Sequence, residues 1–138
     1  METTPLLDVK VDFNGAPAHL KGAHGEVLMI PFRGTVTGEI FQGIVEPCGV
    51  DTQVVNAAGV RHMSARYMLT GTDSAGNPAR IYVENNGWFT NGENPSPFTT
   101  VPTFFTDSPF LAPLLRGPFI GKGVSAPDGL HIRFYPAE

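Results

Sequence analysis

The chain has 138 residues, a formal net charge of −4 and only 16% charged residues, which fits one domain without a basic stripe for nucleic acid. Sixteen glycines and 13 prolines favour short strands joined by turns over long helices. A single cysteine excludes an intrachain disulfide, and we find neither a signal sequence nor an apolar run of about 18 residues. We therefore expect one domain over residues 1–138, located in the cytoplasm, with neither a nucleic-acid nor a membrane partner.

Apolar and polar residues alternate in many short runs, which is typical of half-buried strands. Pro31 marks an edge, a bulge or a corner, because proline donates no hydrogen bond to a ladder. In chain order, the predicted strands are residues 7–13, 26–32, 34–45, 53–56, 60–70, 80–85, 99–105, 119–120 and 130–135. We expect loops at residues 16–25 and 88–102 and a helical turn or lid at 108–115, the second loop being long enough to indicate a function.

Short connections without crossover helices favour an all-β fold. The fold class that we predict is a single antiparallel β-barrel of about eight or more strands, because closure leaves no exposed sheet edge. A barrel of this size either fills its interior with side chains or holds one small ligand. The polar side chains of the strands decide between these two cases.

The predicted strand at residues 60–70 carries chemically interesting residues on both faces. His62 and Arg66 share one face, whereas Met63, Ala65 and Tyr67 share the other. The pattern leaves open which face lines the barrel. If the first face points inward, Arg66 would anchor a carboxylate, enolate or phenolate and His62 could move protons near neutral pH. If it points outward, Arg66 is a surface or dimer-interface charge.

Other polar and aromatic residues also have two interpretations. Asp51 either forms a turn or faces the cavity as a base. Asn85 shares a strand face with Ile81 and Val83, so its amide could orient a ligand at the end of an apolar lining. The aromatic residues from Trp88 to Phe110 either fill the barrel end or line a pocket for a ring-bearing ligand. The candidate ligand-binding residues are Asn85, Tyr67, Glu39, Trp88 and Phe104.

Five short motifs occur in an order that resembles one known family. They are Gly49-Val-Asp51, Ala65-Arg66-Tyr67, residues 81–87, Phe104 with Thr106, and Phe119-Ile-Gly121-Lys-Gly123. In this order they resemble the family called domain of unknown function 3237, over residues 27–135. The resemblance implies a compact, calycin-like β-barrel with a central cavity, and no agreed reaction. The chain departs from the family pattern at Cys48, Thr52, Phe105, Pro113 and Leu115. Asp51, Arg66 and Asn85 remain as the residues whose roles could carry over.

The sequence contains no phosphate loop, dinucleotide motif or hydrolase elbow and no clear metal-ligand spacing, so we expect no cofactor and no metal. The leading hypothesis is a cofactor-independent isomerase, cyclase or lyase that acts on a small, partly apolar carbonyl compound by general acid–base catalysis. Its catalytic residues would be Asp51, Arg66 and His62. The alternatives are a non-catalytic small-molecule binding or carrier protein and a structural or interaction module. If the apolar face of the strand at residues 60–70 lies outside the barrel, it has to be covered, which predicts a homo-oligomer, most simply a dimer.

Overall fold

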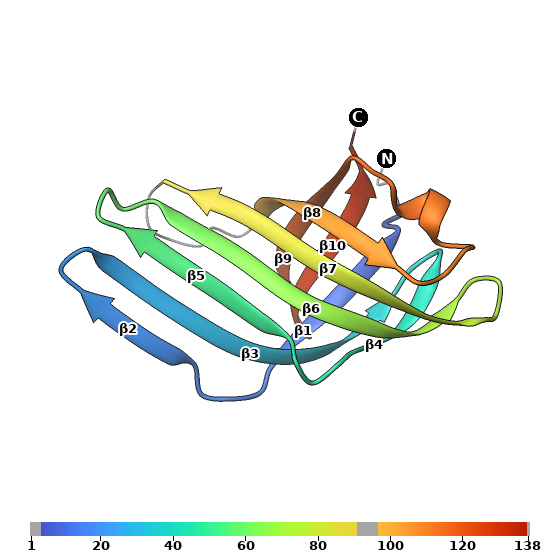
Figure 1. Cartoon of the computed structure of the whole chain (residues 1–138), viewed down its shortest axis with the longest axis horizontal. Helices are drawn as coiled ribbons and strands as arrows, with labels where there is room; N and C mark the ends of the chain where they lie inside the picture. The colour runs from blue at the N-terminus through green and yellow to red at the C-terminus, as the bar shows by residue number, and fades with distance from the viewer. Residues whose placement is uncertain (1–3, 91–96, 138) are drawn as a thin grey trace.

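The computed structural model describes residues 4–90 and 97–137 and forms a closed antiparallel β-barrel, as the sequence predicts (Figure 1). Its strands are β1 (Leu7–Phe13), β2 (Ala18–Gly22), β3 (Gly25–Thr37), β4 (Phe41–Val45), β5 (Val50–Asn56), β6 (Arg61–Asp73), β7 (Pro78–Phe89), β8 (Phe98–Thr106), β9 (Phe119–Ala126) and β10 (Gly129–Pro136). A short 3-10 helix, Ala112–Leu115, follows β8, where a helical turn or lid is expected. In the described part of the chain, no helix combines the length and hydrophobicity needed to cross a membrane.

Strand β1 closes the barrel because it pairs with strands from both ends of the chain. It lies between β10 and the second half of β3. From β10 the ring continues through β9, β8, β7 and β6. Strands β5 and β4 share one position between β6 and β3, with β5 along the first half of β3 and β4 along the second. The described barrel therefore has eight strand positions, while β2 extends the sheet beside β3.

Strand β3 is continuous where the sequence analysis expects two strands. Pro31 lies at the point where β3 changes neighbours. The pairing of β3 with β2 extends to Met29, and its pairing with β1 starts at Phe32. The backbone N–H of Phe32 donates to the carbonyl oxygen of Gly49, at 3.0 Å, on the side of β5. Successive N–H groups of a strand point to opposite sides, so an N–H group at residue 31 would point away from β5. Neither β2 nor β1 pairs with β3 at that point, so proline leaves no ladder hydrogen bond unmade there.

Two predicted loops are partly strands. Strand β2 lies inside the loop expected at residues 16–25, and all five of its residues are exposed, so it lacks the alternation that marks a half-buried strand. In the loop expected at 88–102, Trp88 and Phe89 end β7, and residues 98–102 begin β8. Residues 91–96 of that loop lie outside the described residues. Strands β2, β3, β5, β6 and β7 extend past the others as an open, curved sheet, which we call the wide end (Figure 1).

An aromatic cluster fills the closed part of the barrel, beyond the wide end. Phe134 is fully buried, and its ring meets that of Phe104 edge to face, with centroids 5.2 Å apart. Phe119 meets Phe104 in the same way at 5.3 Å. Buried aliphatic residues surround these rings: Leu7, Val9, Val36, Val45, Leu69, Ile81, Val83, Leu111, Leu115 and Ile132. Much of the interior is therefore packed side chains, and free space is confined to its margin.

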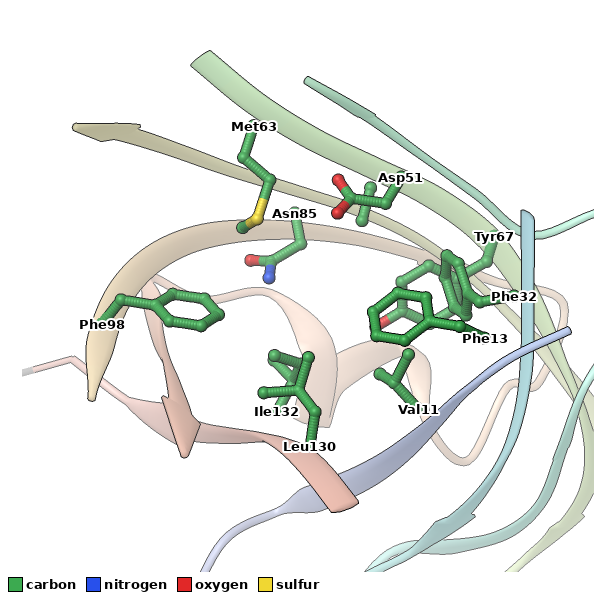
Figure 2. A pocket seen from close by; sticks show the side chains of 11 residues that line it. Val11, Phe13, Phe32, Asp51, Met63, Tyr67, Asn85, Phe98, Leu130 and Ile132 are labelled. Atoms are coloured by element: carbon green, nitrogen blue, oxygen red, sulfur yellow. The ribbon is translucent and has the colours of Figure 1, made fainter. Parts of the chain in front are cut away.

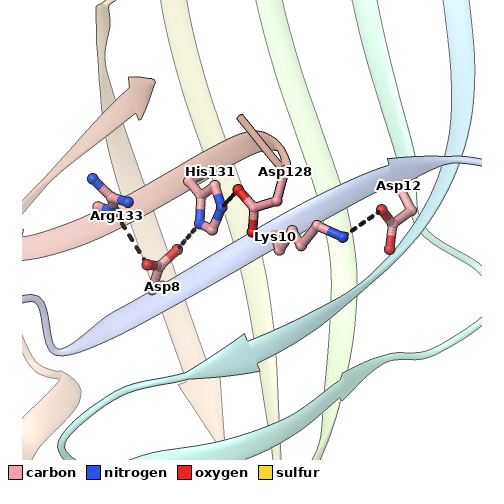
Figure 3. A network of polar contacts seen from close by, with 6 residues as sticks. All are labelled: Asp8, Lys10, Asp12, Asp128, His131 and Arg133. Atoms are coloured by element: carbon pink, nitrogen blue, oxygen red, sulfur yellow. Dashed lines mark hydrogen bonds and ion pairs between the residues drawn. The ribbon is translucent and has the colours of Figure 1, made fainter. Parts of the chain in front are cut away.

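The outer face of the β1–β10 seam carries a charged network (Figure 3). His131 Nδ1 lies 2.8 Å from Asp8 Oδ1, and His131 Nε2 lies 2.8 Å from Asp128 Oδ1. Arg133 Nε donates to Asp8 Oδ2 at 3.1 Å. Burial alone would lower the pKa of His131, but the hydrogen bonds and negative charges of Asp8 and Asp128 outweigh it and raise this pKa. The network therefore favours the imidazolium form, which donates from both ring nitrogens.

We expect this network to make barrel stability depend on pH. Because the pKa of His131 is raised on folding, its stabilisation is full below the unfolded-state pKa of about 6.5 and is lost as pH rises through the folded-state pKa. His131→Gln should remove this dependence and cost about 0–1 kcal/mol below pH ~6. Urea unfolding of both proteins between about pH 5 and about pH 9 measures the difference. His24→Gln, at an exposed residue, is the control. If the free energy of unfolding of the wild type minus that of His131→Gln grew with pH, the prediction would be contradicted.

Candidate functional site

A pocket lies where the wide end meets the closed barrel (Figure 2). Its volume is about 30 Å³, room for on the order of two water molecules. Most of its wall is apolar or aromatic: Val11, Phe13, Phe32, Met63, Ala65, Phe98, Leu130 and Ile132. The wall also includes three residues with polar groups, Asp51, Tyr67 and Asn85. A few polar groups set in an apolar wall are typical of small-molecule sites.

Strand register places two of these polar residues in one row across the sheet. Asp51 of β5 pairs with Ala65 of β6, which in turn pairs with Asn85 of β7. Neighbouring strands lie about 4.8 Å apart, so the backbones of Asp51 and Asn85 are separated by roughly 10 Å. Only the methyl group of Ala65 stands between them. This small side chain leaves the room that the pocket occupies.

The two carboxyl oxygens of Asp51 have different surroundings. Oδ2 accepts a hydrogen bond from Nε2 of Gln53 at 2.8 Å, whereas Oδ1 is buried without a partner among the described residues. Burial raises the pKa of this carboxyl, against the smaller opposing effects of the Gln53 hydrogen bond and the charge of Arg61. A raised pKa brings the carboxyl closer to the range where it can both give and take a proton at neutral pH.

Asn85 and Tyr67 complete the polar part of the pocket. Asn85 is 2% exposed, its Oδ1 has no partner in the described structure, and its side-chain amide points into the pocket (Figure 2). Burial, and to a lesser extent the charge of Asp51, raises the pKa of the Tyr67 hydroxyl, so this group stays an O–H donor. An unpaired buried polar atom costs about 1–3 kcal/mol. The unpaired oxygens of Asp51 and Asn85 therefore leave unused hydrogen-bonding capacity at this pocket.

Arg66 and His62 lie on the outer wall of the barrel. The Arg66 side chain is 63% exposed, and its Nε is 3.7 Å from Glu84 Oε1. His62 stacks on Trp88 with ring centroids 4.7 Å apart, and its Nε2 lies 3.1 Å from Asn86 Oδ1. Of the two orientations that the sequence left open, the structure has the outward one for Arg66 and His62, because the other face of β6 points inward and supplies the pocket and the core. The catalytic roles suggested for Arg66 and His62 required the inward orientation, so neither residue lies at the pocket.

The apolar face of β6 is therefore covered by the barrel itself. This removes the reason given above for a dimer, because Met63, Tyr67 and Leu69 are buried within one chain. Self-association stays a prediction. Exposed apolar side chains on the outer wall include Trp88, Val101 and Phe105.

Three further candidates also lie away from the pocket. Trp88 is 59% exposed on the outer wall, and Phe104 is buried in the aromatic core. Glu39 borders a polar depression of about 270 Å³ beside the β6–β7 turn, together with Asp73. In that depression Asp73 is already used, since its oxygens accept hydrogen bonds from the turn backbone and from Ser108. Within the described ranges, no group of three or more His, Cys, Asp or Glu side chains is arranged to hold a metal.

Two polar residues next to the site were not among the candidates from the sequence. Gln53 is 5% exposed and donates to Asp51, and Arg61 Nη1 donates to Gln53 Oε1 at 2.8 Å. The period of two could have found Gln53, because residues 51 and 53 of one strand share a face. Arg61 comes from the neighbouring strand, and only the pairing of β5 with β6 brings it close.

These features define a class of small β-barrel proteins with a mostly apolar pocket that contains a carboxyl group, an amide and a phenol at its wide end. The chain belongs to the family described as Protein of unknown function (DUF3237), whose model matches residues 1–137. Among its relatives, a UPF0311 protein of Clostridium acetobutylicum is 34% identical over 126 residues, covering 80% of this chain and 77% of that protein.

Solved structures show the same barrel. A protein with unknown function from Clostridium acetobutylicum ATCC 824 has a TM-score of 0.74 at 30% identity, covering 99% of this chain and 95% of its own. A β-barrel-like protein from Acinetobacter baumannii AYE has a TM-score of 0.74 at 23% identity, with coverage of 98% and 94%. A conserved protein of unknown function from Rhodopseudomonas palustris gives 0.73 at 27% identity, with coverage of 96% and 95%. None of these names states a ligand or a reaction.

Proposed function

We propose that the pocket binds a small, partly apolar carbonyl compound and that the protein rearranges it by general acid–base catalysis, as a cofactor-independent isomerase, cyclase or lyase. The observation that supports this most is Asp51, a buried carboxyl with one oxygen held by Gln53 and the other unpaired beside the pocket. One positioned acid or base contributes about 10²–10⁴ in rate. The proposal places the protein in the cytoplasm.

The proposed roles keep that of Asp51 and change those of the other residues expected from the sequence. Asp51 exchanges a proton with the ligand. The amide N–H of Asn85 and the hydroxyl of Tyr67 donate to the carbonyl oxygen, the role that the sequence analysis assigns to Arg66. Fixed donors in a site of low dielectric stabilise the negative charge that develops on such an oxygen. His62 and Arg66 have no part in this mechanism.

The apolar wall receives the rest of the ligand. Phe13, Phe98 and Leu130 supply aromatic and aliphatic surface close to the polar group. A pocket of about 30 Å³ admits a ligand larger than a few water molecules only if side chains rotate. Phe13 is the natural candidate, because it is 55% exposed at the end of β1 and has few contacts to lose. Ligand binding should therefore bury Phe13.

Ala65→Leu should block the pocket while the barrel stays folded. The added carbon atoms would enter the space between Asp51 and Asn85, at a stability cost of about 1–3 kcal/mol. With acetophenone as a ketone probe, we expect binding at least about tenfold weaker than in the wild type, a loss of about 1.4 kcal/mol. Saturation-transfer NMR measures binding, and thermal unfolding checks the fold. Ala112→Leu, at an exposed position of the 3-10 helix, is the control. Undiminished binding to Ala65→Leu would place the ligand outside this pocket.

A further inference from the structure

A line of polar side chains leads along the inner face of the wide end to Asp51. Arg61 Nη1 donates to Gln53 Oε1 at 2.8 Å, and Gln53 Nε2 donates to Asp51 Oδ2 at 2.8 Å. Gln53 and Asp51 are both buried, so the bond between them is shielded from water, whereas the bond between Arg61 and Gln53 is partly buried. Buried, shielded hydrogen bonds restrict the side chains that they join more than exposed ones do.

Arg61 decides the direction of every bond in this line. A guanidinium group only donates hydrogen bonds, so Gln53 must turn its amide oxygen toward Arg61. The amide nitrogen of Gln53 then faces Asp51 and donates to Oδ2. A neutral carboxyl group accepts most strongly through its carbonyl oxygen. In neutral Asp51, Oδ2 is therefore the carbonyl oxygen, and the proton lies on Oδ1, the oxygen without a partner in the described structure.

We infer that Gln53 and Arg61 are positioning residues that hold the proton of Asp51 on Oδ1, and that the pocket consequently selects uncharged carbonyl compounds over carboxylates. The inference rests on the proposed function and names the ligand class of the same site. It also identifies Arg61, rather than Arg66, as the arginine that serves the site, through Gln53 and without contact to the ligand.

The charges around the site support this selectivity. The residues that line the pocket include Asp51 but no Lys, Arg or His. Arg61 donates a hydrogen bond to Gln53 on β5, and its charge also acts on Glu26 of β3. The pKa of Glu26 is lowered first by its hydrogen bond with His19 of β2 and then by the charges of His19, Lys21 and Arg61. A bound carboxylate would thus lose its hydration without an opposite charge in contact, which is costly.

An uncharged carbonyl compound meets the opposite situation. Its oxygen can accept from Oδ1–H of Asp51, from the amide of Asn85 and from the hydroxyl of Tyr67, all of which line the pocket. In the reaction, the Oδ1–H bond breaks as the proton passes to the ligand, and the resulting carboxylate removes a proton from a neighbouring carbon of the same ligand. Oδ1–H is restored, and no atom or electron is gained or lost. The ligand is then in its enol form, an intermediate from which an isomerase, a cyclase or a lyase can proceed.

Infrared difference spectroscopy of the ligand-free protein tests where the proton lies. At a pH where Asp51 is neutral, subtracting the spectrum of the matching Asp51→Asn protein isolates the C=O stretch of Asp51. In Gln53→Met the carbonyl oxygen Oδ2 loses its donor, so the band should move to higher wavenumber. Arg61→Met frees the amide of Gln53 to turn over and should also move the band. Arg66→Met, on the same strand but the outer wall, should leave it in place.

Two outcomes of the infrared experiment would overturn the positioning role of Gln53 and Arg61. A band that stays in place in folded Gln53→Met and Arg61→Met overturns the positioning role. So does a failure of both variants to fold while Arg66→Met folds, because it would show a structural role instead. Circular dichroism establishes folding before the spectra are compared.

Competition between acetophenone and benzoate tests the ligand class, because the two share a phenyl ring and similar size but only benzoate is charged. NMR titration at pH ~7 should show acetophenone binding at least about tenfold more tightly. Equal or tighter binding of benzoate overturns the selectivity. If the infrared band moves but neither compound binds, the proton assignment stands and the proposed function fails. If acetophenone binds but the band stays, the proposed function stands and the positioning role fails.

Discussion

Asp51→Asn is expected to lower proton transfer to a bound ketone by about 10²-fold or more while ligand affinity stays within about tenfold. Asparagine has nearly the same shape and keeps a side-chain oxygen that can accept from Gln53, but it has no proton to exchange at neutral pH. Hydrogen–deuterium exchange at the methyl group of acetophenone in D₂O, followed by proton NMR, measures the transfer. A titration in the same samples measures the affinity.

Asp12→Asn is the matched control, because Asp12 is exposed and paired only with Lys10 in the described structure. It should change neither exchange nor affinity. A wild-type protein that binds acetophenone but does not accelerate exchange would identify a carrier rather than an enzyme. An Asp51→Asn protein that is folded and exchanges at the wild-type rate would remove Asp51 from the mechanism. One that fails to fold would show that Asp51 is needed for the fold itself.

Phe134→Ala is expected to cost about 3–5 kcal/mol of unfolding free energy. Phe134 is fully buried, its ring meets Phe104, and its strand position pairs with Leu7 of β1 and with Gly121 of β9. A Cβ at Gly121 would lie only 3.0 Å from the Phe134 ring, so the site is tightly filled. Removing the ring leaves a cavity at the closure of the barrel that rigid strands cannot collapse to fill.

Phe105→Ala is the control for this prediction, since Phe105 is 69% exposed on the outer wall of β8. Its effect should stay within about 0.5 kcal/mol. Urea denaturation of the three proteins at one pH compares the free energies of unfolding. Equal costs for the two phenylalanines would mean that the aromatic cluster does not hold the barrel closed.

Most strands and the barrel class could be predicted from the sequence, because half-buried strands show a period of two in hydrophobicity. The same period placed Asn85 correctly, since it shares a face with Ile81 and Val83, which are fully buried. Exposed β2 escaped prediction because it has no buried face. Pro31, predicted to mark an edge, a bulge or a corner between two strands, lies within continuous β3, between its pairings with β2 and with β1.

The face of β6 that lines the barrel could not be predicted, because both of its faces mix polar and apolar residues. Alternation sorts such residues into two sets, but only packing against neighbouring strands decides which set is buried. Here β6 lies between β5 and β7, and its Ala65 falls between Asp51 and Asn85. Arg66 and His62 then have to face outward.

The sequence by itself therefore determined most of the strands, the all-β class and the identity of Asp51, Tyr67 and Asn85 as polar residues worth following. Tertiary structure alone decided that these three meet at one pocket and that Arg61 and Gln53 stand behind Asp51. The physical reason is that local periodicity acts over neighbouring residues, whereas register and closure join distant ones. The seam contact between Asp8 and His131 spans 123 positions of the chain, a pairing that no local pattern encodes.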